Sequence, residues 1–180
     1  MFSSIRWQKS IVVWLLATCL WLPSSVWSDE AILRVALVYN FIKFIEWPAT
    51  DQQKTIQLCA LDAKGDALNA LQQLKGKTAN KQVVEVVYLH VNDLFHVYLN
   101  NCHILYLSHP SADLPTPLPE GVVLIADEPE ENDPNVSIAL RRNKAGRIEF
   151  EVNLTAANRA GVRVSSQLLK LATKTRGGKS

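Results

Sequence analysis

The segment Ile56-Gln57-Leu58-Cys59-Ala60-Leu61 is a short apolar run, which is typical of a buried β-strand. Leucines then recur at helical spacing between Gly65 and Leu74, and the β-branched run Val83–Leu89 follows them. A strand, a helix and a second strand in this order indicate an α/β fold.

The same alternation continues on both sides of this unit. Upstream, the sequence from Asp29 to Glu46 predicts a helix that has Asp29 as its N-cap and ends before Pro48. Downstream, we expect a short helix around Asn92–Leu99 and strands at His103–Leu107, Val122–Ala126, Val136–Arg141 and Arg147–Asn153. The prolines of Ser108–Gly121 and the acidic residues of Asp127–Asn135 predict loops.

The C-terminal third predicts a β-hairpin followed by two helices. The turn Asn143-Lys144-Ala145-Gly146 joins the last two strands. Asn153 is the expected cap of a helix that stops at Gly161, and Ser165 is the expected cap of the next, which carries Leu168, Leu169 and Leu171. We therefore expect one α/β domain over residues 29–173, with helices packed on a mixed β-sheet, and a disordered tail over residues 174–180.

The N-terminus has the pattern of a secretory signal peptide. Arg6 and Lys9 precede the apolar run Ile11–Leu22, and Val26 and Ser28 suit the small positions of a cleavage site. The run is too short for a stable membrane span of roughly 20 residues. We expect cleavage of residues 1–28 and export to the periplasm. An uncleaved anchor and lipidation at Cys19 are the alternatives.

Charge gives no support to a nucleic-acid or anionic-membrane partner. The chain has 19 basic and 17 acidic residues, and two of the basic ones, Arg6 and Lys9, lie in the leader. The mature chain is therefore neutral overall.

Two cysteines remain after cleavage, Cys59 and Cys102. In an oxidising compartment two cysteines most simply pair, and each of these lies at the edge of an expected buried strand. We expect a disulfide between them, with two buried free thiols as the alternative.

No motif in the sequence indicates catalysis, a cofactor or a metal ion. Gly76-Lys77-Thr78 resembles the end of a phosphate-binding loop, but Leu71 stands where that loop needs a glycine. The chain has no Gly-x-Ser-x-Gly and no Cys-x-x-Cys motif. Its four histidines do not pair at metal-binding spacing: His90, His96, His103 and His109. We therefore expect a protein that is not an enzyme and that binds no cofactor.

Three stretches of the sequence resemble the YfiR family, also known as the DUF4154 domain. They are YNFIKFIEWP (residues 39–48), GRIEFEVN (residues 146–153) and AGVRVSSQLLKLA (residues 160–172). The middle part of the family is matched by CHILY (residues 102–106) and by the strand that contains Leu58 and Cys59. The resemblance covers essentially the whole mature chain. The chain departs from the family in the Glu130–Asn135 loop, in its proline-rich segment Ser108–Gly121, and in having only two mature cysteines.

The resemblance implies a periplasmic repressor that holds an inner-membrane diguanylate cyclase inactive, with an outer-membrane lipoprotein as the opposing partner. Release of the cyclase raises cyclic-di-GMP and favours biofilm formation. The resemblance also implies a homodimer, and disulfides that contribute to stability.

Our first functional hypothesis is therefore a regulatory binding protein. The aromatic residues of the first helix are mostly expected in the core, but some can face a partner or a second copy of the chain. The residues expected to bind the partner come from the first and last helices: Asn40, Lys43, Phe44, Trp47, Arg163, Leu168 and Leu169. The alternative is a periplasmic small-ligand domain serving another sensor or transporter, with a pocket near Asp62, Asp127 and Arg163.

Overall fold

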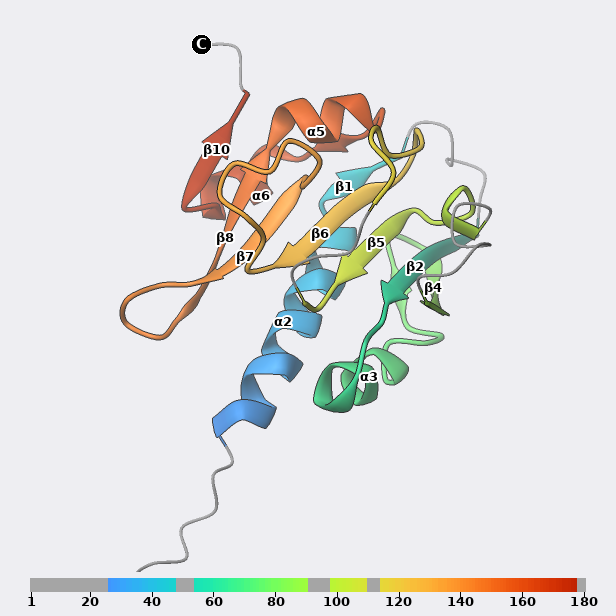
Figure 1. Ribbon diagram of the computed structural model, residues 1–180. Coiled ribbons are helices and arrows are strands. Elements are labelled where there is room, and N and C mark those ends of the chain that lie inside the picture. The colour runs from blue at the N-terminus through green and yellow to red at the C-terminus, as the bar shows by residue number, and fades with distance from the viewer. Residues whose placement is uncertain (1–25, 48–53, 91–97, 110–113, 178–180) are drawn as a thin grey trace, which may run out of the picture.

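A computed structural model describes residues 26–47, 54–90, 98–109 and 114–177 of the chain. Within these ranges, one sheet has eight strands in the order β10-β8-β7-β6-β5-β2-β4-β3 (Figure 1). In chain order they are β2 (Thr55–Leu61), β3 (Thr78–Ala79), β4 (Gln82–Leu89), β5 (Ile104–Leu107), β6 (Val123–Asp127), β7 (Ile138–Arg142), β8 (Ile148–Asn153) and β10 (Lys174–Arg176). The mixed α/β sheet expected from the sequence is thus confirmed.

The centre of the sheet is parallel and has a topological switch point. From β2 the chain passes through helix α3 (Gly65–Gln72) to β4, which pairs with β2 on one side. The next strand, β5, pairs with β2 on the other side, and β6 continues outward from β5. The strand order therefore reverses direction between β2 and β5, and the carboxyl ends of these strands lie at the same edge of the sheet.

The helices cover one face of the sheet. Because side chains alternate along a strand, Leu58 and Ala60 of β2 face an apolar cluster that includes Phe41 of α2 (Val26–Ile42) and Leu71 of α3. The same cluster takes in residues of α5 (Leu154–Arg159) and α6 (Ser166–Leu171). The opposite side of β2 contributes Cys59 to a second cluster under loop segments. Figure 1 shows α2 behind the strands, with its N-terminal half extending past the ends of β5 and β6.

The C-terminal hairpin and its two helix caps were predicted correctly. Strands β7 and β8 pair antiparallel across the Asn143–Gly146 turn. The Asn153 side chain accepts hydrogen bonds from the amides of Thr155 and Ala156 at 3.1 and 3.3 Å, and Ser165 accepts one from the amide of Leu168 at 3.3 Å. These caps depend only on local sequence, which is why a short pattern was enough to find them.

The first helix was predicted with the wrong limits. It begins at Val26, so Asp29 lies inside it rather than capping it, and it ends at Ile42. Residues Ile45–Glu46 form strand β1, which pairs with β9 (Arg163–Val164) in a separate two-stranded sheet. This pairing with a distant segment ends the helix, although the apolar pattern continues beyond Ile42.

The predicted disordered tail is also wrong in part. Lys174–Arg176 forms β10, which pairs parallel with β8 at the edge of the sheet. Just before it, the amide of Thr173 donates to the carbonyl of Phe150 at 2.9 Å. The polar composition of the tail suggested a solvated segment, but the open edge of β8 offers backbone partners that composition does not reveal.

Several predictions lie outside the described residues. These include residues 1–25 of the expected leader, residues 178–180 of the tail, and most of the helix expected around Asn92–Leu99. Among the described helices, none combines the length and apolar character required to cross a membrane.

Candidate functional site

The expected disulfide between Cys59 and Cys102 is present. Cys59 lies in β2 and Cys102 comes two residues before β5, its parallel neighbour in the sheet. Their Cα atoms are 5.8 Å apart, and both residues are buried. The bond therefore ties the two central strands together at the point where the strand order reverses.

Two of the stretches that resemble the YfiR family, residues 39–48 and 160–172, meet in space. Ile45 pairs with Val164 and Glu46 with Arg163 across the β1–β9 sheet. The amide of Ser165 also donates to the carbonyl of Phe44 at 2.9 Å. The end of α2 and the start of α6 are consequently held side by side.

Five of the seven residues expected to bind a partner remain at the surface around this pairing. Asn40, Lys43 and Arg163 are exposed, and Phe44 and Leu169 are half-buried. We call these five residues the junction surface. Lys43 Nζ donates to Asn40 Oδ1 at 2.9 Å and lies 4.6 Å from the centre of the Tyr39 ring.

The other two expected partner residues are in the core. Trp47 is 6% exposed, and its indole Nε1 donates to the carbonyl of Gly121 at 3.0 Å. Leu168 is 1% exposed. Their expected role in partner contact is therefore corrected: helical spacing marks both as apolar, but it does not tell a core face from a contact face.

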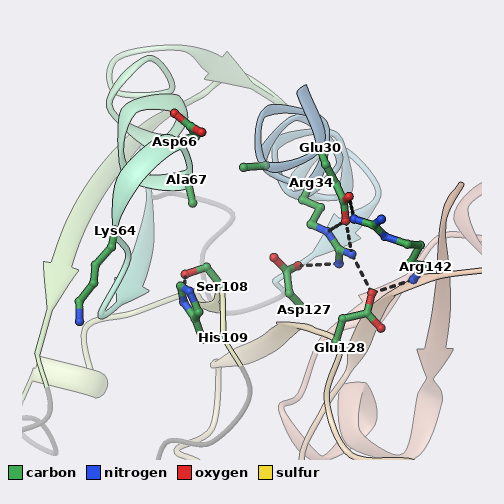
Figure 2. Close-up of a pocket in the computed structure, with 11 residues that line it drawn as sticks. Glu30, Arg34, Lys64, Asp66, Ala67, Ser108, His109, Asp127, Glu128 and Arg142 are labelled. Carbon is green, nitrogen blue, oxygen red and sulfur yellow. Dashed lines mark hydrogen bonds and ion pairs between the residues drawn. The ribbon is translucent and has the colours of Figure 1, made fainter. Parts of the chain in front are cut away.

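A cavity of about 540 Å³ opens at the carboxyl ends of the parallel strands (Figure 2). Helix α2 lines it with Glu30, Ala31 and Arg34, and the start of α3 lines it with Lys64, Asp66 and Ala67. The ends of β5, β6 and β7 contribute Ser108, His109, Asp127, Glu128 and Arg142. This volume is within the range of small-molecule sites, and the edge of the sheet is the one at which open α/β folds bind ligands.

A network of ion pairs forms one wall of the cavity. Arg34, which is 6% exposed, donates through Nε and Nη2 to Glu30 at 3.0 and 2.7 Å and through Nη2 to Glu128 at 2.7 Å. Arg142 pairs with Glu30, and its amide donates to Glu128 Oε1 at 2.7 Å. The network fastens the N-terminal half of α2 to the ends of β6 and β7.

Asp127 lies beside this network and makes fewer hydrogen bonds to its arginines than Glu30 and Glu128 do. Its Oδ2 accepts a hydrogen bond of 2.6 Å from the Tyr106 hydroxyl, and its Oδ1 is 3.7 Å from Arg34 Nη1. Burial raises the pKa of Asp127 to about 6, although the Tyr106 hydrogen bond and the Arg34 charge act in the opposite direction. Burial and the neighbouring Asp127 carboxylate raise the pKa of Tyr106 as well.

The pocket expected from the sequence was placed only in part correctly. Asp127 lines the cavity, but Arg163 lies at the β1–β9 pairing instead. Asp62 is not among the lining residues; its Oδ1 is 2.9 Å from His90 Nδ1. Arg34 was not predicted as a site residue, although Glu30 stands four residues before it, the spacing at which helical ion pairs form.

A family model described as DUF4154, YfiR/HmsC-like, matches residues 31–173. The chain belongs to the DUF4154 family. No curated protein matches the chain.

The family's description, YfiR/HmsC-like, agrees with the sequence resemblance, which implies a periplasmic regulator of diguanylate cyclase signalling. In this DUF4154 protein the matched region includes the β1–β9 pairing, the disulfide and every residue that lines the cavity except Glu30. Among the described residues, no three histidine, cysteine or acidic side chains are grouped so that they can hold a metal ion.

Proposed function

We propose that the protein is exported through a cleaved signal peptide and represses an inner-membrane sensor, a diguanylate cyclase, in the periplasm. By holding the cyclase inactive it lowers cyclic-di-GMP and restrains biofilm formation. Its family membership supports this proposal. A difference of a few kcal/mol in binding to the two states of the sensor is enough for such control.

The observation that carries the proposal is the β1–β9 pairing. It joins two of the family-like stretches, residues 39–48 and 160–172, and leaves the junction surface facing solvent. The Lys43 side chain, for example, is exposed, and its described contacts are with Asn40 and Tyr39 of the neighbouring helix α2. A partner therefore gains access to both stretches at once, and we place the sensor contact there.

The test is binding of the purified protein to the periplasmic domain of a membrane diguanylate cyclase from the same bacterium. Lys43→Glu reverses one charge on the junction surface, and Lys144→Glu makes the same charge change in the exposed β7–β8 turn. We expect Lys43→Glu to weaken binding and Lys144→Glu to leave it unchanged. Equal binding by both variants and the wild type would place the contact elsewhere.

The same proposal includes a homodimer and an outer-membrane lipoprotein that relieves repression. Both come from the family likeness. Light scattering of the purified protein tests the dimer, and recovery of the lipoprotein with the tagged protein from envelope extracts tests the second partner.

A second candidate function is small-ligand binding in the service of another sensor or transporter. The observation that favours it is the cavity at the switch point of the sheet. Ligand-dependent melting of the purified protein separates this function from repression by protein contact alone.

A further inference from the structure

The wall of the cavity described above has one carboxylate more than it has guanidinium groups. Glu30, Asp127 and Glu128 face Arg34 and Arg142 (Figure 2). Arg34 directs its hydrogen bonds to Glu30 and Glu128, and Arg142 contacts the same two acids. Both guanidinium groups thus make their closest contacts with Glu30 or Glu128, and Arg34 also forms a longer ion pair of 3.7 Å with Asp127.

Asp127 is the carboxylate that this network leaves incompletely paired. The residue is 6% exposed, and its Oδ1 atom has no hydrogen-bond partner among the described residues. The nearest cation, Arg34 Nη1, is 3.7 Å away, beyond hydrogen-bond distance, and it also lacks a hydrogen-bond partner. Buried carboxylate oxygens normally accept hydrogen bonds, so we expect a bound ligand to donate one to Asp127 Oδ1.

The remaining walls offer space for the body of a small molecule. Ala31 of α2 and Ala67 of α3 add small apolar side chains to the lining. Ser108 and His109 lie near Ala67, on the far side of the cavity from Arg142 (Figure 2). The Ser108 hydroxyl and His109 Nδ1 are 3.0 Å apart, so their polar groups contact each other. A metal ion is a poor candidate, because the described residues contain no group of three metal-binding side chains.

We propose that this cavity binds a small organic amine, with its ammonium group donating to Asp127. An ammonium supplies a hydrogen-bond donor for Asp127 Oδ1 and one positive charge for the additional carboxylate. A neutral hydroxyl supplies only the donor. An anion can accept a hydrogen bond from Arg34 Nη1, but it adds negative charge to a wall that already has one carboxylate in excess. The assignment deepens the second candidate function by naming the ligand class, and it does not depend on the contact with the sensor.

Putrescine, butanediol and succinate test the assignment, because they share a four-carbon chain and differ in the charge of their end groups. Binding to the purified full-length mature protein is measured by calorimetry and by the shift of the melting temperature, near neutral pH. We expect putrescine to bind and to raise the melting temperature, while butanediol and succinate do not.

Two variants and a control locate the site. Asp127→Asn removes the charge and should weaken putrescine binding about tenfold or more. Glu131→Gln removes an exposed acid from the loop after β6 and should leave binding unchanged. Ala31→Leu fills part of the cavity and leaves every ion-pair residue in place. It should abolish putrescine binding, so the site remains testable even where Asp127→Asn does not fold.

Three outcomes would overturn the assignment. Failure of putrescine to bind would do so, as would binding that Asp127→Asn and Ala31→Leu leave intact. Binding of butanediol or succinate in place of putrescine would also overturn the ligand class, while leaving small-ligand binding itself in place. Loss of binding to the cyclase domain by Lys43→Glu is measured separately, so the two proposals fail independently.

Discussion

Glu46 of β1 lies directly opposite Arg163 of β9, in a two-stranded sheet that is separate from the main one. This pair joins the end of the first helix to the start of the last, and it is the reason that distant parts of the sequence share one surface. Residues next to this pair that are buried, such as Trp47 and Leu168, support the fold. Exposed residues next to it, such as Lys43, face solvent. Substitutions on the two sides should therefore have different effects.

Trp47 should matter for stability rather than for partner contact. Trp47→Ala removes a large buried ring and should lower the free energy of unfolding by about 3–5 kcal/mol. Trp47→Phe keeps an aromatic ring but loses the hydrogen bond to Gly121, and should cost about 1 kcal/mol. Urea denaturation measures both. Lys43→Glu is the exposed counterpart and should stay within about 0.5 kcal/mol of the wild type. A stable Trp47→Ala protein would contradict the core placement.

The disulfide should contribute substantially to stability. Cys59 and Cys102 are 43 residues apart in sequence, and cross-linking a loop of that length stabilises by about 4 kcal/mol on the chain-entropy model. The Cys59→Ser, Cys102→Ser double variant should therefore unfold at lower denaturant concentration than the oxidised wild type. Reduction should lower wild-type stability toward that of the double variant and leave the variant itself unchanged. Insensitivity of the wild type to reduction would show that the bond is unimportant for stability.

Asp127 should make the protein less stable as the pH rises through the weakly acidic range. Its folded pKa of about 6 lies above the ordinary value of 3.8 for an aspartate, so between these values the folded state holds a proton that the unfolded state has released. Stability attributable to this group is complete below about pH 4 and is lost as the pH passes 6. The groups around it are Tyr106, Arg34 and Glu128.

Comparison with Asp127→Asn isolates this effect. Between pH 4 and pH 6.5 the wild type should lose roughly 2–3 kcal/mol relative to the variant, because a pKa difference of one unit corresponds to about 1.4 kcal/mol. Denaturant titrations of both proteins across that range give the difference. Parallel pH profiles would mean that Asp127 titrates normally.

Strand β10 should stabilise the neighbouring strand β8 and protect its amides from hydrogen exchange. Deleting residues 174–180 removes the backbone partners of Glu151–Asn153 and should lower stability by about 2 kcal/mol. Hydrogen exchange should accelerate at β8 amides, while those of the central strand β2 change only as far as global stability does. Unchanged protection at β8 would argue against the strand pairing.

The sequence predicted the features that depend on local patterns. The central strands, the hairpin and the caps at Asn153 and Ser165 each have a signature within a few residues. Strands β1 and β10 have no such signature, because two or three residues become a strand only through a distant partner.

The candidate sites also divide into features with a local sequence signature and features that depend on distant partners. The disulfide could be predicted because the chain has few cysteines and each adjoins an apolar strand. The Arg34 network could not be assembled in advance, since Glu128 and Arg142 reach it only through the order of the strands. The burial of Trp47 and Leu168 likewise follows from packing that apolar spacing alone does not specify.

The most direct test of the central claim is the cellular concentration of cyclic-di-GMP in the source bacterium with and without this gene. We predict that deletion raises the concentration, that the wild-type gene restores it, and that Lys144→Glu restores it while Lys43→Glu does so less well. A concentration that is unchanged by deletion would contradict the repressor proposal.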